Sequence, residues 1–167
     1  IDKSKSGRMV GVSFKKEEPK KQETKLEKLT VILIGSLLVE QELVKKVKKI
    51  LSEIEGSGGL WKVLVFILEN ASGKDEVGDL LSKMPIELQE VAKEVFMSTD
   101  IAEVDEKNIL DVAVKIAREM IREKRVELST LRQLAEEKGE TDKEKEILLR
   151  LRDLDNRENR LFSLDFA

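Results

Sequence analysis

The stretch LRQLAEEKGETDKEKEILLRLRDLDN, residues 131–156, combines regularly spaced leucines with a very high density of charged side chains. Gly139 is the type of residue that commonly ends a helix. Thr141 followed by Glu144 has the spacing of a capping box, which starts a new helix. Because only a few residues separate these two signals, the two helices should run side by side in opposite directions. The stretch therefore predicts an antiparallel helical hairpin.

The first arm of this hairpin belongs to a much longer helix. Residues 106–138 contain no Pro or Gly, so we predict one uninterrupted helix that would reach on the order of 50 Å. Its first half has a broad apolar face and belongs in a core, whereas only a narrow seam continues beyond Ile121 and should project. Leu148, Leu149 and the chain end from Arg160 have no obvious partner within the chain. The residues expected to close the hairpin are Leu128, Leu131, Leu134 and Ala135 on one arm and Ile147, Leu151 and Leu154 on the other.

Upstream of the long helix, residues 24–105 show several shorter helical patterns. Thr24 and Glu27 form another capping-box pattern, and the apolar residues that follow recur every three or four positions. This first helix is nearly apolar between Val31 and Leu38, so we expect it at the centre of a bundle. A second apolar stripe, with lysines on the opposite face, comprises Leu43, Val44, Val47, Ile50 and Leu51.

The apolar run LWKVLVFILEN, residues 60–70, is ambiguous because its pattern fits either a buried strand or a buried helix. We predict a helix, since a lone buried strand would leave backbone groups unsatisfied and no comparable second strand is available. A short helix is expected over residues 76–83, and Pro85 suits the first position of the next one. The predicted fold class is therefore all-α, with a helical bundle over residues 24–121 followed by the antiparallel C-terminal helical hairpin over residues 122–167.

Residues 1–23 carry runs of charge and no sustained apolar period, so we interpret them as a basic linker or tail from a preceding domain. Residues 1–28 hold nine Lys and Arg against five Asp and Glu, whereas the whole chain has a net charge of −3. Loose contact with phosphate groups would suit this charge, but a solvated tether is the simpler interpretation. Because the first residue is Ile rather than Met, we expect the chain to be part of a longer protein.

The composition argues against most enzymatic chemistry. The chain has no Cys and no His, which removes thiolate ligands, disulfides, the commonest metal ligand and the commonest general base. The glycine-containing segments at residues 56–59 and 72–75 lack the spacing of a Walker loop, and the acidic hairpin turn lacks the ligand spacing of an EF-hand. We therefore expect no catalytic, cofactor-binding or metal-binding residues.

Partners and location can also be argued from the residue content. The lysine run VKKVKK, residues 44–49, is more simply a solvated helix face than a nucleic-acid site, because aromatic platforms for base stacking are lacking. No apolar run is long enough to cross a membrane and the first residues do not resemble a signal peptide, so we expect a cytoplasmic protein. The abundance of Lys, Glu and Arg, within 39% charged residues, is typical of thermophilic proteins.

Two segments carry a resemblance to a known family. The first is KLEKLTVILIGSLLVEQELVKKVKKIL (residues 25–51) and the second is AREMIREKRVELSTLRQLAEEKGETDKEKEILLRLRDLDNRENRL (residues 117–161). They are similar to the opening helices and the closing hairpin of the C-terminal, helicase-binding domain of bacterial DNA primase of the DnaG type. The likeness extends from about Thr24 to the end of the chain and lies in the order of the elements. One departure is the hairpin turn, which reads GETD at residues 139–142 where the family has a turn like Gly-Asp.

The resemblance implies a recruiting domain without a catalytic centre. In the family, a helical bundle similar to the N-terminal domain of the replicative helicase precedes a hairpin that docks on this hexameric helicase. The polymerase and zinc-binding parts lie upstream. By resemblance, this chain would bring primase to the replication fork for primer synthesis and would not itself be an enzyme. A hairpin with spare leucines suits helix-in-groove binding. The residues that we predict to contact the helicase are Leu148, Leu151, Leu161 and Phe162 as apolar anchors, with Arg152 and Arg157 as polar contacts.

Two other functions fit the same pattern of helices. The first is the related N-terminal domain of the replicative helicase, which has the bundle but continues into a linker and an ATPase. The second is a structural module that self-associates weakly through its hairpin. Sedimentation at several protein concentrations separates the second alternative from a binding domain that stays monomeric.

Overall fold

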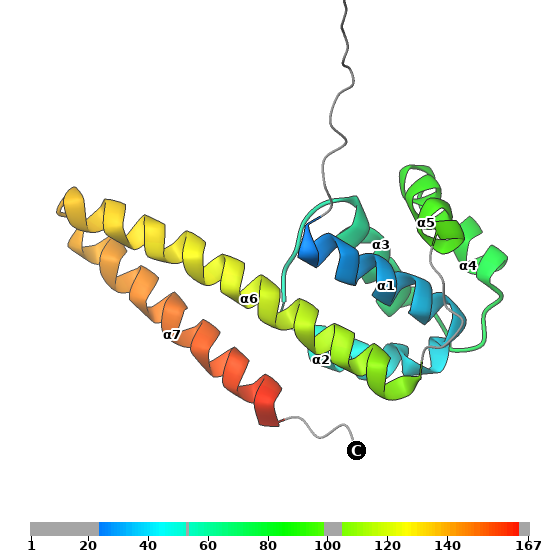
Figure 1. Ribbon diagram of the computed structural model, residues 1–167. Coiled ribbons are helices and arrows are strands. Elements are labelled where there is room, and N and C mark those ends of the chain that lie inside the picture. The colour runs from blue at the N-terminus through cyan, green and yellow to red at the C-terminus, as the bar shows by residue number, and fades with distance from the viewer. Residues whose placement is uncertain (1–23, 53, 99–104, 164–167) are drawn as a thin grey trace, which may run out of the picture.

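The computed structural model describes residues 24–52, 54–98 and 105–163, and the predicted tail at residues 1–23 lies outside this range. All regular secondary structure in the described residues is helical, which confirms the all-α fold class (Figure 1). In chain order the elements are α1 (Lys25–Val39), the 3₁₀ helix η2 (Gln41–Leu43), α2 (Val44–Leu51), α3 (Gly59–Asn70), α4 (Val77–Ser82), α5 (Ile86–Ser98), α6 (Glu106–Glu137) and α7 (Thr141–Ser163).

Helix α1 begins at the predicted capping box. The hydroxyl of Thr24 accepts a hydrogen bond from the Glu27 N–H (3.1 Å), and the Glu27 carboxylate accepts one from the Thr24 N–H (2.9 Å). These bonds satisfy two N–H groups at the helix start. Further along, Leu33, Ile34 and Leu37 are completely buried, because α3, α5 and α6 pack around α1. The helix therefore lies at the centre of the bundle, as its apolar sequence predicts.

Helix α3 forms from the ambiguous apolar run, and the structure confirms it as a helix. Val63, Leu64 and Ile67 are completely buried, since α1, α2 and α5 pack against this helix from several sides. Such cover explains why the sequence is apolar over most of the helix circumference. Helix α2 is the opposite case, because its lysines are exposed and only one side is buried. That side consists of the predicted stripe residues Val44, Val47, Ile50 and Leu51.

A buried glutamine joins η2 to the loop before α4. Gln41 is nearly inaccessible, and its Nε2 donates hydrogen bonds to the carbonyl oxygens of Leu38 (3.2 Å) and Asp75 (2.8 Å). Its Oε1 accepts the N–H of Asp75 (3.0 Å). Because donor and acceptor are both paired, burial of the amide costs little. The Asp75 carboxylate accepts the Ser72 N–H (2.7 Å), which lowers the pKa of Asp75 below its ordinary value.

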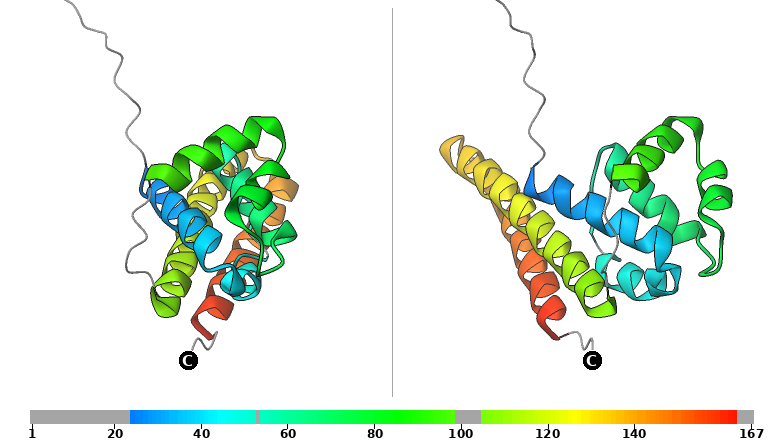
Figure 2. Two further views of the ribbon diagram at one scale, coloured as in Figure 1. Left: turned by 90° about the vertical axis from the view of Figure 1, so that its right-hand side faces the viewer. Right: turned by 45° about the vertical axis from the view of Figure 1, so that its right-hand side comes forward.

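Helix α6 connects the bundle to the hairpin. Beyond the bundle it continues without a break, and α7 returns alongside it in the opposite direction (Figures 1 and 2). The two helices project from the bundle as one arm. The predicted domain boundary at residue 121 falls inside α6 and stays a prediction. The first part of α6 packs on α1 and α2, and the residues that it buries there are Ile109, Leu110, Ala113, Ile116 and Ala117.

A left-handed glycine closes the hairpin. Gly139 has a φ of 70°, which glycine adopts without the steric cost of a side chain. The N–H of Glu140 donates to the carbonyl of Ala135 (2.8 Å), and the N–H of Gly139 donates to that of Glu136 (3.1 Å). Carbonyl groups in the last turn of α6 are thereby paired. The predicted helix stop at Gly139 is confirmed.

Candidate protein-interaction surface on the hairpin

Apolar residues at intervals of seven hold the hairpin together. A seven-residue repeat keeps side chains on nearly the same face of a helix, as in a coiled coil. Leu151, which lies between two repeats on α7, is half-buried and packs against the same core. The buried residues of this seam are Ile121, Leu128 and Ala135 on α6 and Ile147, Leu154 and Leu161 on α7.

The structure corrects the predicted seam on α6. Leu128 and Ala135 lie in the seam as expected, but the side chains of Leu131 and Leu134 are 43% and 46% exposed. Ile121, which the prediction placed at the end of the bundle, supplies the third buried position. Two of the four predicted α6 residues therefore do not close the hairpin.

Helical periodicity explains why these two leucines are exposed. Leu131 follows Ala113, and Leu134 follows Ile116, by 18 residues, which is about five full turns. Ala113 and Ile116 are buried in the bundle. The two leucines thus continue the line of α6 that faces the bundle, at a point where the bundle has ended. The sequence pattern assigned them to the hairpin seam because the face of α6 toward the bundle and the face toward α7 both contain leucine.

Three arginines of α6 form a second seven-residue repeat, which lies beside the apolar seam. Arg125 lies midway along the hairpin, where its Nη2 donates hydrogen bonds to Asp155 Oδ1 and Glu158 Oε1, each at 2.8 Å. The hydrogen bond that Arg125 donates to Glu158, together with the one it donates to Asp155, raises the pKa of Arg125 above its ordinary value, although desolvation opposes this rise. The guanidinium therefore bridges two successive turns of α7 while remaining charged.

The neighbouring arginines of the repeat contact the two ends of α7. Near the turn, Arg132 Nε lies 3.7 Å from a carboxylate oxygen of Glu144, so the acid predicted as a cap contacts the opposite helix. At the other end, the guanidinium carbon of Arg118 lies 4.2 Å from the centroid of the Phe162 ring, which is a cation–π contact. Three arginines spaced by seven residues thus fix the register of the two helices.

A double-mutant cycle tests this bridge. Combining Arg125→Ala with Glu158→Ala is expected to give a coupling energy of about 0.5–1.5 kcal/mol, because both side chains are partly shielded from water. The matched control is the pair Arg150 and Glu146, which is far more exposed and should couple by less than about 0.5 kcal/mol. Urea unfolding of all variants supplies the measurement. Equal coupling in the two cycles would show that Arg125 contributes no more than an ordinary surface ion pair.

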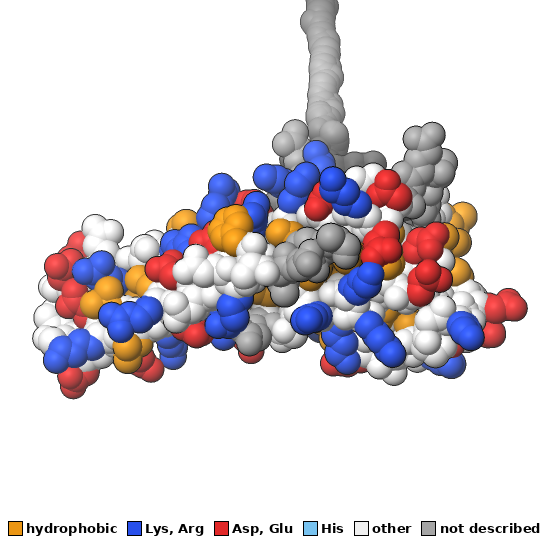
Figure 3. Space-filling view, turned by 90° about the horizontal axis from the view of Figure 1, so that it is seen from below, with side chains coloured by type: hydrophobic (Ala, Val, Ile, Leu, Met, Phe, Trp, Pro, Cys, Tyr) orange, Lys and Arg blue, Asp and Glu red, His pale blue; other side chains and the backbone are white. Residues whose placement is uncertain are grey.

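One side of α7 is exposed along its whole length. Its residues recur at alternating spacings of four and three, which places them on one face of the helix, separate from the seam. We call this face the outer stripe. In Figure 3 the hairpin carries small separate groups of hydrophobic side chains among charged ones. The outer stripe consists of Leu148, Arg152, Asp155, Asn159 and Phe162, all of them exposed.

The structure divides the predicted contact residues among different faces. Leu148, Arg152 and Phe162 share the outer stripe, with exposed fractions of 41% for Leu148 and 63% for Phe162. Leu151 lies at the edge of the seam and is only half-buried. Asp155 and Asn159, which complete the outer stripe, were missed, although the same four-and-three spacing in the sequence could have identified them.

Two predicted contact residues are reassigned. Leu161 is only 7% exposed, because it forms the last buried position of the hairpin seam. We therefore correct its predicted role as an exposed anchor to one in closing the hairpin. Arg157 pairs with Asp153 at 3.1 Å, and both line a pocket with Ile54 from the bundle. Arg157 thus faces the bundle rather than the outer stripe.

The described residues contain no group of three or more Asp or Glu side chains arranged to hold a metal ion. None of the described helices is both long enough and apolar enough to cross a membrane. The hairpin carries exposed apolar side chains among charged ones. No protein-family model, curated protein or solved structure matches this chain. Residues and geometry, rather than a relative of known function, carry the functional proposal.

Proposed function

We propose that this chain is the helicase-binding domain of a bacterial DNA primase and that it recruits primase to the replication fork. The observation that supports this most is the outer stripe on α7. The hairpin is closed by its own buried seam, so Leu148 stays exposed without being needed to hold α6 and α7 together. Phe162 contacts Arg118 of α6 with its ring but still exposes 63% of its surface to a partner. Exposed apolar side chains flanked by charges on a projecting helix suit docking into a groove of another protein.

The spacing of the two apolar residues defines what the partner must offer. Leu148 and Phe162 are 14 residues apart, which corresponds to about 21 Å along the helix. Arg152 lies between them and would contact acidic or polar groups of the partner. A helicase surface with two apolar pockets at this separation would accept both anchors at once. Large aromatic and aliphatic anchors of this kind carry most of the binding free energy in protein interfaces.

Helix α6 would transmit binding to the bundle. It is continuous from Glu106 to Glu137, and Ile121 lies in it at the junction of the bundle and the hairpin seam, where it is 2% exposed. A force applied to the hairpin therefore acts on a helix that is itself part of the bundle core. The bundle would fix the direction of the arm on the helicase ring.

The proposal is tested with the full chain and the hexameric replicative helicase. We expect the two to form a complex in sedimentation velocity, and Leu148→Asp and Phe162→Ala each to weaken it about tenfold or more. The matched control is Leu134→Asp, whose side chain is similarly exposed but lies on α6 outside the outer stripe. No complex with the parent chain contradicts the function. Equal weakening by all three variants contradicts the outer stripe as the contact.

Self-association through the same stripe is the second candidate, because exposed apolar side chains also suit a second copy of the chain. Sedimentation of the chain alone over a hundredfold range of concentration distinguishes the two. A dimer that Leu148→Asp dissociates, together with no binding to the helicase, would favour the structural module.

A further inference from the structure

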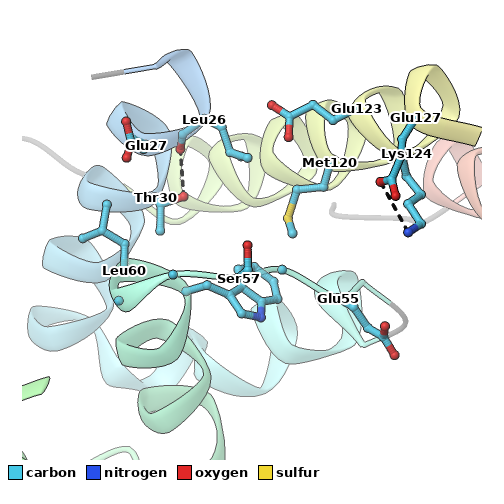
Figure 4. A pocket seen from close by; sticks show the side chains of 14 residues that line it. Leu26, Glu27, Thr30, Glu55, Ser57, Leu60, Met120, Glu123, Lys124 and Glu127 are labelled. Carbon is cyan, nitrogen blue, oxygen red and sulfur yellow. Dashed lines mark hydrogen bonds and ion pairs between the residues drawn. The ribbon is translucent and has the colours of Figure 1, made fainter. Parts of the chain in front are cut away.

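A pocket of about 500 Å³ lies on the side of the bundle, between the start of α1, the segment before α3 and the middle of α6 (Figure 4). Its volume is in the range of small-ligand and peptide side-chain sites. The pocket is separate from the outer stripe, and the proposed helicase contact does not use it. The residues that supply its apolar surface are Leu26, Leu60, Trp61 and Met120, all of them partly buried against the core.

The rim of this pocket is acidic. Glu27, Glu55, Glu123 and Glu127 line it, and the only basic lining residue is Lys124. Lys124 already pairs with Glu127 (3.5 Å), whereas Glu55 and Glu123 form no ion pair among the described residues. Unpaired carboxylates around an apolar floor attract a cationic group and favour an occupant that also carries a large apolar side chain.

We propose that residues 8–16 of this same chain, RMVGVSFKK, occupy the pocket, with Phe14 on the apolar floor and Lys15 and Lys16 at the acidic rim. The sequence of this segment has both required features, because apolar residues lie between Arg8 and the two lysines. Its charge is opposite to that of the rim.

The position of the pocket relative to α1 supports this occupant over a separate peptide. The first turn of α1 supplies Leu26 and Glu27 to the pocket, so the chain that precedes α1 arrives at its edge. Lys16 and Lys25 are nine positions apart in the sequence, so the chain between them reaches at most roughly 30 Å. A tether of this length gives an effective concentration of about 1 mM. A contact with a dissociation constant of about 0.1 mM would therefore be about nine-tenths formed within one molecule.

Trp61 provides a direct readout, because it lines the pocket and is the only Trp in the sequence. In the full chain, Phe14→Ala is expected to shift Trp61 emission to longer wavelength and to raise its quenching by acrylamide about twofold, since the tethered segment no longer covers the ring. Glu123→Lys should have the same effect from the pocket side. The matched control is Glu137→Lys at the distal end of the hairpin, which should change neither property.

A synthetic peptide of residues 8–16 completes the test. Added at about 1 mM to the Phe14→Ala chain, it should restore the original quenching, whereas a peptide with Phe replaced by Ala should not. Unchanged emission and quenching in Phe14→Ala would overturn the proposal. It would equally be overturned if the protection of Trp61 in the parent chain disappeared on dilution, because the occupant would then be a second copy. The readout needs no helicase, so its failure is distinct from failure of the proposed function.

Discussion

Leu128→Ala is expected to lower the free energy of unfolding by about 2–4 kcal/mol, whereas Leu131→Ala should lower it by less than about 1 kcal/mol. Leu128 is 2% exposed in the hairpin seam and Leu131 is 43% exposed. Removing three buried carbons at Leu128 leaves a cavity between α6 and α7. Removing the same carbons at Leu131 leaves no cavity, because most of that side chain is already in contact with water. Both substitutions lie in the same helix and exchange the same residue types, so the difference in helix propensity cancels.

Urea unfolding monitored by circular dichroism measures both effects. The comparison decides which line of α6 closes the hairpin, because the sequence pattern assigned both leucines to the seam. Similar losses of stability for the two variants would contradict the seam described by the structure. A larger loss of stability for Leu131→Ala would indicate that α6 is rotated about its axis, so that the face with Leu131 packs against α7.

The all-α class and most helix positions follow from local signals that act within a few residues. The capping box at Thr24, the glycine stop at Gly139 and the apolar period of α1 and α2 depend on hydrogen bonds and side-chain spacing within one element. Such signals are readable without knowledge of the neighbours. They therefore predicted the elements well.

The faces of the hairpin were harder to predict, because they depend on where the bundle ends. Leu134 lies 13 residues beyond Ile121 and would be buried if the bundle extended about three to four turns further along α6, and its sequence context is the same in either case. Beside the seam lies Arg125, which a search for apolar residues passes over. An arginine beside a seam is recognisable as a contact between the helices only when its carboxylate partners on α7 are in register, and register is a tertiary property.

The candidate contact surface was also hard to predict, because it too depends on how the helices pack. Six residues were predicted from the sequence to contact a partner, and three of them, Leu148, Arg152 and Phe162, lie on the outer stripe. The other three, Leu151, Arg157 and Leu161, do not. Leucine and phenylalanine at successive positions point about 100° apart on a helix, so only one of the two can share a face with the seam. Burial of Leu161 and exposure of Phe162 follow from the rotation of α7 about its axis, which the packing against α6 sets.

Gly56→Ala is the second substitution for which we expect a large effect, with a loss of about 1–3 kcal/mol in the free energy of unfolding. The sequence predicted only that the glycines after α2 end the helix. In the structure, a Cβ at Gly56 would lie 2.5 Å from Met120 Cε and 2.6 Å from Trp61 Cδ2. These distances are far below van der Waals contact. The added methyl group therefore cannot be accommodated unless the Met120 and Trp61 side chains move.

The two neighbours of Gly56 differ in how easily they can yield. Met120 has a flexible thioether end that can change rotamer, but the Trp61 ring is rigid, and its Cγ would also lie 2.9 Å from the new Cβ. The ring must then tilt or the segment before α3 must shift. Because Trp61 packs against the core, either movement disturbs buried contacts. Trp61 emission should change together with the loss of stability.

A matched control is Gly78→Ala in α4, where a new Cβ would have no atom within 4 Å. There the exchange should leave stability unchanged or raise it by up to about 1 kcal/mol, since alanine favours the helical conformation. Combining Gly56→Ala with Met120→Ala should recover part of the loss, because one of the two close contacts is removed, and the non-additivity measures that contact. If Gly56→Ala were as stable as the parent chain and left Trp61 emission unchanged, the close approach of Met120 and Trp61 around this glycine would be contradicted.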